Sequence, residues 1–182
     1  MQTIEQTVQR WLEDVVIGLD LCPFAAKPQR KRQVRVSVSA AGTEQQLLND
    51  TQTELRLLDS TASDELETTL LIVPDMLADF DDYNQFLNLT DELLQQYNWQ
   101  GRYQIASFHP HYRFAGTCSD DAENLTNRSP HPILHILREA SVEKALQNYP
   151  APEQIPERNI NKIRRLTASQ RQKSFPYLVP GE

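Results

Sequence analysis

Apolar residues recur at three- and four-residue intervals along several stretches of the chain, a spacing that predicts amphipathic helices. The first of these stretches runs from Ile4 to Leu19. Thr43 can cap the second helix, and Gln46 completes a capping box three residues later. We expect five helices, over about residues 4–19, 43–58, 79–97, 129–148 and 153–168.

Three shorter segments have the pattern of strands. Residues 33–39 alternate valines with polar residues, which is typical of a strand with one buried face. The run TTLLIV at 68–73 is apolar without alternation, as in strands that are covered on both faces, and we place it at the sheet centre. The third strand, RYQIASF, covers 102–108 and ends just before His109.

Strands and helices alternate along most of the chain, which favours the α/β class with right-handed crossovers. We therefore expect a single layer-packed domain over residues 1–182, with a small three-stranded parallel or mixed sheet and a loosely held tail from about residue 169. If the strands are parallel, Ser39, Asp75 and His109 follow their carboxyl ends, where open α/β sheets bind ligands.

Composition and charge narrow the classes of partner. The net charge is −7, and residues 44–92 hold thirteen acidic residues and one base, Arg56. Such a block is typical of a solvated face, and the overall charge argues against sequence-independent nucleic-acid binding. The chain has no apolar run long enough for a membrane helix and no signal-peptide pattern, so we expect a cytoplasmic protein without membrane contact. Nothing in the sequence indicates an oligomeric state.

All four histidines lie between Phe108 and Glu139. His135 and Glu139 are four residues apart, which would place them on one face of the expected helix. Together with His109 they match a two-histidine, one-carboxylate site, so a transition metal is the one cofactor that the spacing suggests. The alternative ligands are His111, His131, Cys22 and Cys118. The competing interpretation is that these histidines are hydrogen-bonded structural residues.

The start of the expected helix at 129–148 could bind an anion instead. Asn127, Arg128 and Ser129 would lie at its N-terminus, where free N–H groups and the helix dipole favour negative charge. The same dipole would keep His131 and His135 neutral and able to accept a proton. Alternatively, Asn127 and Ser129 merely cap the helix, and Arg128 pairs with an acidic neighbour, namely Asp120, Asp121 or Glu123.

The two cysteines cannot form a disulfide framework or a zinc ribbon. Cys22 could act as a nucleophile if the fold brings a histidine or arginine beside it, but its apolar neighbours favour an inert buried thiol. Cys118 has the surroundings of an exposed loop thiol. The basic run at residues 30–32 is most simply a solvated surface, and it could also bind an acidic partner.

Four segments carry a resemblance to a known family. They are LCPFA at 21–25, FHPHYRFAG at 108–116, NRSPHPILHILREASVEKA at 127–145 and ERNINKIRRL at 157–166. From residue 11 to residue 166 the chain resembles the domain-of-unknown-function family 1415, which brings no assigned reaction. The family patterns F-H-P-x-Y-x-F and N-R-S-P-x-P-x-x-H-x-L-R-E are matched by His109, Tyr112, Asn127, Arg128, Ser129, His135, Arg138 and Glu139. Because His111 and His131 fall on variable positions, the resemblance argues against a four-histidine metal cluster.

Two functions follow as hypotheses. The first is a small enzyme that acts on an anionic small molecule. In it, His109 and His135 are acid/base or metal-binding groups, and Cys22 is a nucleophile. The anion would be held by Tyr112, Asn127, Arg128, Ser129 and Arg138. The second is a non-catalytic binding or assembly protein in which the same motif residues form a structural polar network.

Overall fold

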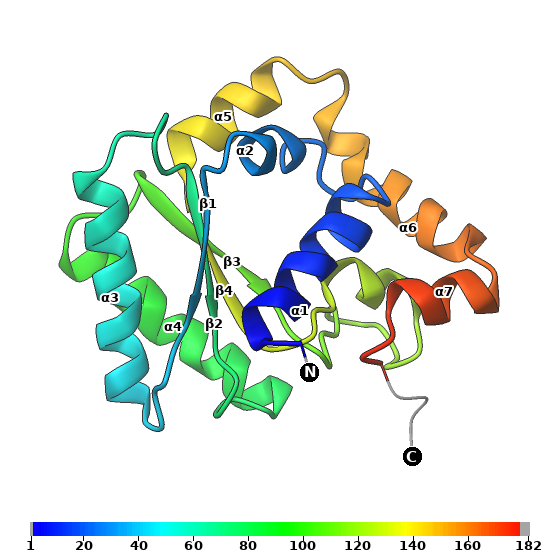
Figure 1. Ribbon diagram of the computed structural model, residues 1–182, viewed down its shortest axis with the longest axis horizontal. Helices are drawn as coiled ribbons and strands as arrows, with labels where there is room; N and C mark the ends of the chain where they lie inside the picture. Colours follow the sequence, from blue (N-terminus) through cyan, green and yellow to red (C-terminus); the bar gives the residue numbers. More distant parts are fainter. Residues whose placement is uncertain (1, 179–182) are drawn as a thin grey trace.

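The computed structural model describes residues 2–178 and contains one mixed four-stranded sheet (Figure 1). Its strands stand in the order β1 (Val34–Val38), β2 (Thr68–Ile72), β4 (Ile133–Arg138) and β3 (Tyr103–Phe108). β2 pairs parallel with β1 and antiparallel with β4, and β3 pairs antiparallel with β4. Hence β1, β2 and β3 run in the same direction, and their carboxyl ends share one edge of the sheet.

The α/β class, the mixed sheet and the three expected strands are confirmed, but the count of three strands is wrong. The fourth strand, β4, forms from the first half of the segment expected to be a helix at 129–148, and α5 (Glu139–Gln147) forms from its second half. The segment ILHILR is nearly continuously apolar, and Ile133, Leu134 and Ile136 are fully buried. Such a run fits either a buried helix or a strand covered on both faces, and its pairing with both β2 and β3 selects the strand.

The described residues also contain more helices than the five expected. Besides α5, the α-helices are α1 (Ile4–Trp11), α2 (Ala26–Arg30), α3 (Glu44–Ser60), α4 (Phe80–Gln96), α6 (Ile155–Arg165) and α7 (Ala168–Ser174). Short turns of other helix types are the π-helix η1 (Leu12–Ile17) and the 3₁₀-helices η2 (Ala122–Asn127) and η3 (Pro152–Gln154). None of the helices between residues 2 and 178 is long and apolar enough to cross a bilayer.

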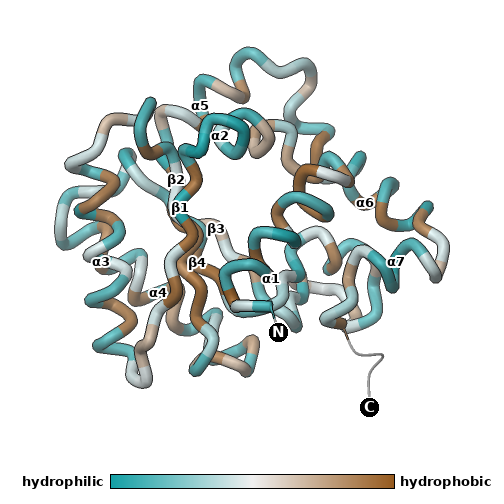
Figure 2. The backbone as a smooth tube through the Cα atoms, in the orientation of Figure 1, coloured by the Kyte–Doolittle hydropathy of each residue, from teal (hydrophilic) through white to brown (hydrophobic). Residues whose placement is uncertain are grey.

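Each face of the sheet packs against its own set of helices. On one face, Leu70, Ile72 and Ile133 form a core with the apolar side of α1 and η1. On the other face, Leu71 and Leu134 pack against α3 and α4 (Figure 1). Figure 2 shows the apolar residues gathered on the central strands and on the helix sides turned toward them. The alternation of side chains along each strand thus supplies two cores from one sheet.

The segment expected as a loosely held tail from about residue 169 contains a helix, α7. Thr167 and Gln170 form a capping box, which starts α7 just where the tail was expected to begin. Phe175 follows α7 and is buried in the same core as α1. Residues 179–182, the last of the expected tail, lie outside the described residues.

The helix expected over 4–19 changes its winding partway. α1 passes into η1, in which the Gly18 amide donates to the Glu13 carbonyl at 2.9 Å, five residues earlier. A Cβ at Gly18 would lie 2.3 Å from the Asp14 carbonyl oxygen, which no side chain tolerates. The wide π turn therefore depends on glycine at this position. Such turns are rare and are frequently found at functional sites.

We expect Gly18→Ala to lower the free energy of unfolding by about 1–3 kcal/mol, because the added methyl group must push the π turn apart. Gly42→Ala is the matched control, since its nearest neighbour would be 3.9 Å away. Urea unfolding of both variants measures the difference. Equal stability of the two variants would show that the π turn is not constrained by glycine.

Candidate functional site

A cavity of about 560 Å³ lies where η1, the loop after β3 and α6 meet. Its walls come from segments far apart in the sequence, and most of its lining is apolar. The lining residues are Val16, Leu21, Cys22, Phe108, Phe114, Thr117, Glu123, Thr126, Asn127, Ile155, Pro156, Asn159 and Ile160. A second, smaller hollow of about 310 Å³ lies beside Gly101 and Glu139.

All four motif segments identified in the sequence contribute to the larger cavity. Cys22 comes from the first segment, Phe108 and Phe114 from the second, Asn127 from the third and Asn159 from the fourth. The smaller hollow takes Glu139 from the third motif and otherwise residues outside the four segments. We therefore regard the larger cavity as the candidate site.

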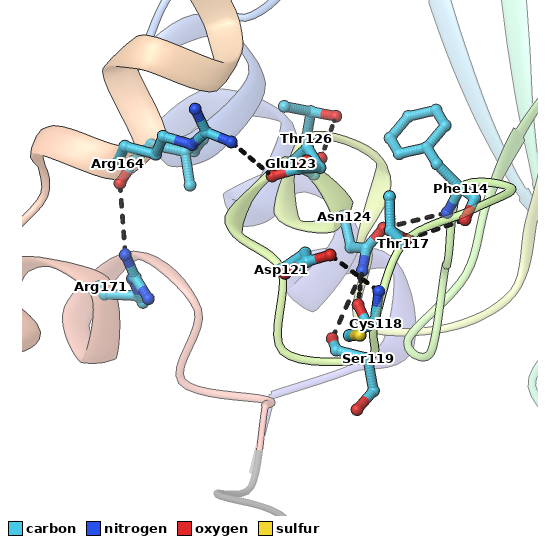
Figure 3. Close-up of polar contacts among 11 residues, drawn as sticks. Phe114, Thr117, Cys118, Ser119, Asp121, Glu123, Asn124, Thr126, Arg164 and Arg171 are labelled. Carbon is cyan, nitrogen blue, oxygen red and sulfur yellow. Dashed lines mark hydrogen bonds and ion pairs between the residues drawn. The ribbon is translucent and has the colours of Figure 1, made fainter.

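The buried amide of Asn124 organises the loop that forms one wall. Its Oδ1 accepts hydrogen bonds from the Phe114 amide at 3.0 Å and the Thr117 hydroxyl at 2.9 Å. Its Nδ2 donates to the carbonyls of Cys118 at 2.7 Å and Ser119 at 3.4 Å (Figure 3). The side chain is fully buried, and its oxygen and nitrogen each make two hydrogen bonds. This residue holds the turn of the loop and was not anticipated from the sequence.

His109 has a structural role at the carboxyl end of β3. Its ring is fully buried against Phe80 and Tyr83. Nδ1 accepts from the His111 amide at 3.0 Å, so Nε2 carries the proton and donates to the Leu77 carbonyl at 2.9 Å. Burial lowers the pKa of His109, which favours this neutral form. With both ring nitrogens bonded to backbone, neither is available to a metal or a substrate.

Arg128 braces the same loop rather than holding an anion. Its Nε donates to the Tyr112 carbonyl at 3.3 Å and its terminal nitrogen to the Ser119 carbonyl at 2.6 Å. Its own carbonyl accepts from the Trp11 indole at 3.0 Å, which ties α1 to the loop. The expected acidic partners do not bind it by a salt bridge in the described chain. Of the three, Glu123 pairs with Arg164 at 3.3 Å (Figure 3).

The expected anion site at a helix N-terminus is wrong, because no helix begins at Ser129. Arg128 has φ −79° and ψ 136°, and the chain continues extended into β4. The Ser129 hydroxyl donates to the His131 carbonyl at 2.6 Å, and Asn127 Nδ2 donates to the Ser107 carbonyl at 3.2 Å. Both side chains hold the entry to the strand, and only Asn127 also lines the cavity.

Arg138 lies at the opposite end of β4 and binds the end of α3. Its guanidinium donates to the carbonyls of Leu58 and Thr61, both at 2.7 Å, and to that of Leu66 at 3.0 Å. A cation at a helix C-terminus interacts favourably with the helix dipole and can donate hydrogen bonds to the free carbonyls. Arg138 and Arg128 are therefore separated by the length of the strand and cannot share one anion.

The structure does not bring the proposed metal ligands together. His135 lies mid-strand opposite Leu70 and Ala106, whereas His109 lies beyond one end of the strand pair and Glu139 beyond the other. Between residues 2 and 178, no three His, Cys, Asp or Glu side chains are grouped closely enough to hold a metal ion.

The Cys22 thiol lines the cavity among apolar neighbours. Burial has the largest effect on the pKa of this thiol and raises it, which favours the protonated thiol over the reactive thiolate. Cys118 is exposed on the loop, as expected.

A comparison with models of known protein families identifies the family of the chain. The family model described as a protein of unknown function, DUF1415, matches residues 3–173. The chain belongs to this family. No curated protein matches the chain, and no solved structure does. In this DUF1415 protein, the motif residues His109, Arg128, Ser129 and Arg138 bond to backbone and do not line the cavity. Cys22 lines the cavity, and Asn127 both bonds to backbone and lines the cavity.

We expect His109→Ala to lower the free energy of unfolding by about 2–4 kcal/mol, because it leaves the buried Leu77 carbonyl without a partner. Arg128→Ala should lower it by about 1–2 kcal/mol, because its contacts to the Tyr112 and Ser119 carbonyls are part-buried and exposed. The matched controls are His111→Ala and Arg113→Ala, two exposed side chains of the same motif. Thermal and urea unfolding of the four variants give the comparison. If each variant is as stable as its control, the motif residues do not form a structural network.

Proposed function

We propose that this DUF1415 protein is a non-catalytic binding protein that encloses a small, mainly apolar molecule. The observation that carries the proposal is the convergence of all four motif segments on one cavity of about 560 Å³. Ligand sites in proteins are typically concave, mostly apolar and of this size. The expected cytoplasmic location is part of the proposal.

The charges around the cavity favour a neutral or cationic ligand. Among the described residues that line the cavity, Glu123 is the only charged one, and its carboxylate is paired with Arg164 at the protein surface. Both arginines expected to hold an anion donate to backbone carbonyls instead. An anion would therefore enter the cavity without a cationic partner among the described lining residues.

The same contacts favour binding over catalysis. An enzyme of the kind expected from the sequence would need His109 free to transfer a proton and Cys22 able to ionise. His109 is bonded at both ring nitrogens, and burial raises the pKa of Cys22. The polar motif residues are better suited to fixing the walls of the cavity than to reacting with its contents.

A pair of fluorescent probes tests the proposal. N-phenyl-1-naphthylamine is neutral, and 8-anilinonaphthalene-1-sulfonate has nearly the same rings with one negative charge. We expect the neutral probe to bind with a stoichiometry of about one, and the anionic probe to bind at least about tenfold more weakly. Fluorescence titration of both probes measures this.

Ile160→Trp is the cavity-filling variant, because Ile160 lines the cavity, and Asn161→Trp adds the same side chain at the exposed next position. We expect Ile160→Trp to weaken the neutral probe at least about tenfold and Asn161→Trp to leave it unchanged. Tighter binding of the anionic probe would favour an anionic ligand instead. Equal binding by both variants would place the probe outside the cavity.

A further inference from the structure

Two asparagines, Asn127 and Asn159, line the cavity and carry side-chain amides. Each is half-buried, and they belong to the third and the fourth motif segment. Asn127 Nδ2 donates to the Ser107 carbonyl at 3.2 Å, and Asn159 Nδ2 donates to the Leu21 carbonyl at 2.6 Å. These bonds join η2 to the end of β3 and α6 to the segment after η1, so both amides hold walls of the cavity together.

Each of these amides keeps one N–H group that the fold does not use. An amide nitrogen carries two N–H groups, and within residues 2–178 each of the two nitrogens makes one hydrogen bond. The two N–H bonds diverge in the amide plane, so the second points away from the carbonyl that the first one binds. Neither nitrogen is sealed behind other groups as a requirement of the fold, and each residue faces the cavity with this second N–H unpaired.

The other side-chain donors of the lining are used or weak. The Thr117 hydroxyl donates to the Phe114 carbonyl at 2.8 Å. The Thr126 hydroxyl donates to the Glu123 carbonyl at 2.7 Å, and a hydroxyl has only one proton. The Cys22 thiol is a weak donor. Among the described side chains of the lining, the strong donors that remain for a ligand are therefore the two amides.

Unpaired donors decide which ligand fits, because they are tolerated less well than unpaired acceptors. Buried N–H groups without a partner are rare in proteins, whereas carbonyl oxygens are left without a full set of partners more often. A ligand that fills the cavity excludes water from both amides, so a wholly apolar ligand leaves their N–H groups unpaired. A ligand with an acceptor at this place replaces the hydrogen bonds that water would make.

We propose that the free N–H groups of Asn127 and Asn159 donate to the ligand, so that the cavity selects neutral apolar molecules that carry a carbonyl group. A carbonyl oxygen has two lone pairs and can accept two hydrogen bonds. A carboxylate is also an acceptor, but the described lining offers it no cationic side chain. This inference rests on the proposed binding function and adds the class of ligand to it.

The test compares 2-acetylnaphthalene with 2-isopropenylnaphthalene, in which a methylene group replaces the carbonyl oxygen and the shape is nearly the same. The alkene is the more hydrophobic compound, so a cavity without free donors would bind it at least as tightly as the ketone. We expect wild-type protein to bind the ketone at least about fivefold more tightly, in line with the net contribution of a buried hydrogen bond. Displacement of N-phenyl-1-naphthylamine, followed by fluorescence, gives both affinities.

The double variant Asn127→Leu/Asn159→Leu removes both amides at nearly constant side-chain size. We expect it to lose the preference for the ketone and still bind the alkene. Asn148→Leu/Asn161→Leu is the matched control, because both asparagines are exposed and lie outside the lining, and it should keep the preference.

A second measurement does not depend on how well the double variant folds. In ¹H–¹⁵N spectra of wild-type protein, the side-chain amide protons of Asn127 and Asn159 should move downfield with the ketone and not with the alkene. Equal or tighter binding of the alkene, equal amide shifts with both compounds, or a preference that survives in the double variant would overturn the inference and leave the binding function standing. Failure of both compounds to bind would contradict the proposed function itself.

Discussion

The cavity depends first on the buried amide of Asn124. An amide side chain enclosed in protein is costly unless its donors and acceptor are satisfied, and here its oxygen and nitrogen each make two hydrogen bonds to one loop. Those bonds fix the turn from Phe114 to Ser119, which Arg128 then ties to the Tyr112 carbonyl. Removing the amide would break its bonds to Phe114, Thr117, Cys118 and Ser119 at once, so the turn of the loop depends on this one side chain.

The network extends from the loop into the two main layers of the fold. The Trp11 indole reaches the Arg128 carbonyl from α1, and His109 joins the end of β3 to the Leu77 carbonyl. These polar groups bond to backbone and do not line the cavity, whose described lining is mostly apolar. The motif residues therefore support the walls of the cavity, which agrees with the proposed binding role.

Much of the fold follows from the sequence, because periodicity is local. The strands at 33–39 and 68–73 and the helix starting at Thr43 were expected close to where they lie. The segment 133–138 was mistaken for helix because an apolar run on its own suits both structures. Only its partners, β2 and β3, decide between them, and pairing between distant strands is not visible in local spacing.

Of the residues expected at the site, only Cys22 and Asn127 line the candidate cavity. Arg128 and His109 bond instead to backbone carbonyls, which every residue carries and no sequence pattern marks. Asn124 lies within the long loop without regular periodicity, and nothing in its neighbours distinguishes it from a solvated loop asparagine. The apolar neighbours of Cys22 favour an inert thiol over a nucleophile, and the structure places the partly buried thiol on the cavity wall with a raised pKa.

The most direct test of the account is a map of backbone amide shifts on binding of N-phenyl-1-naphthylamine to ¹⁵N-labelled protein. We expect the largest shifts in four separate segments, at residues 16–22, 108–117, 123–127 and 155–160, and no shifts in α3 and α4. Shifts confined to the hollow beside Gly101 and Glu139, or spread over α3 and α4, would contradict binding in the larger cavity.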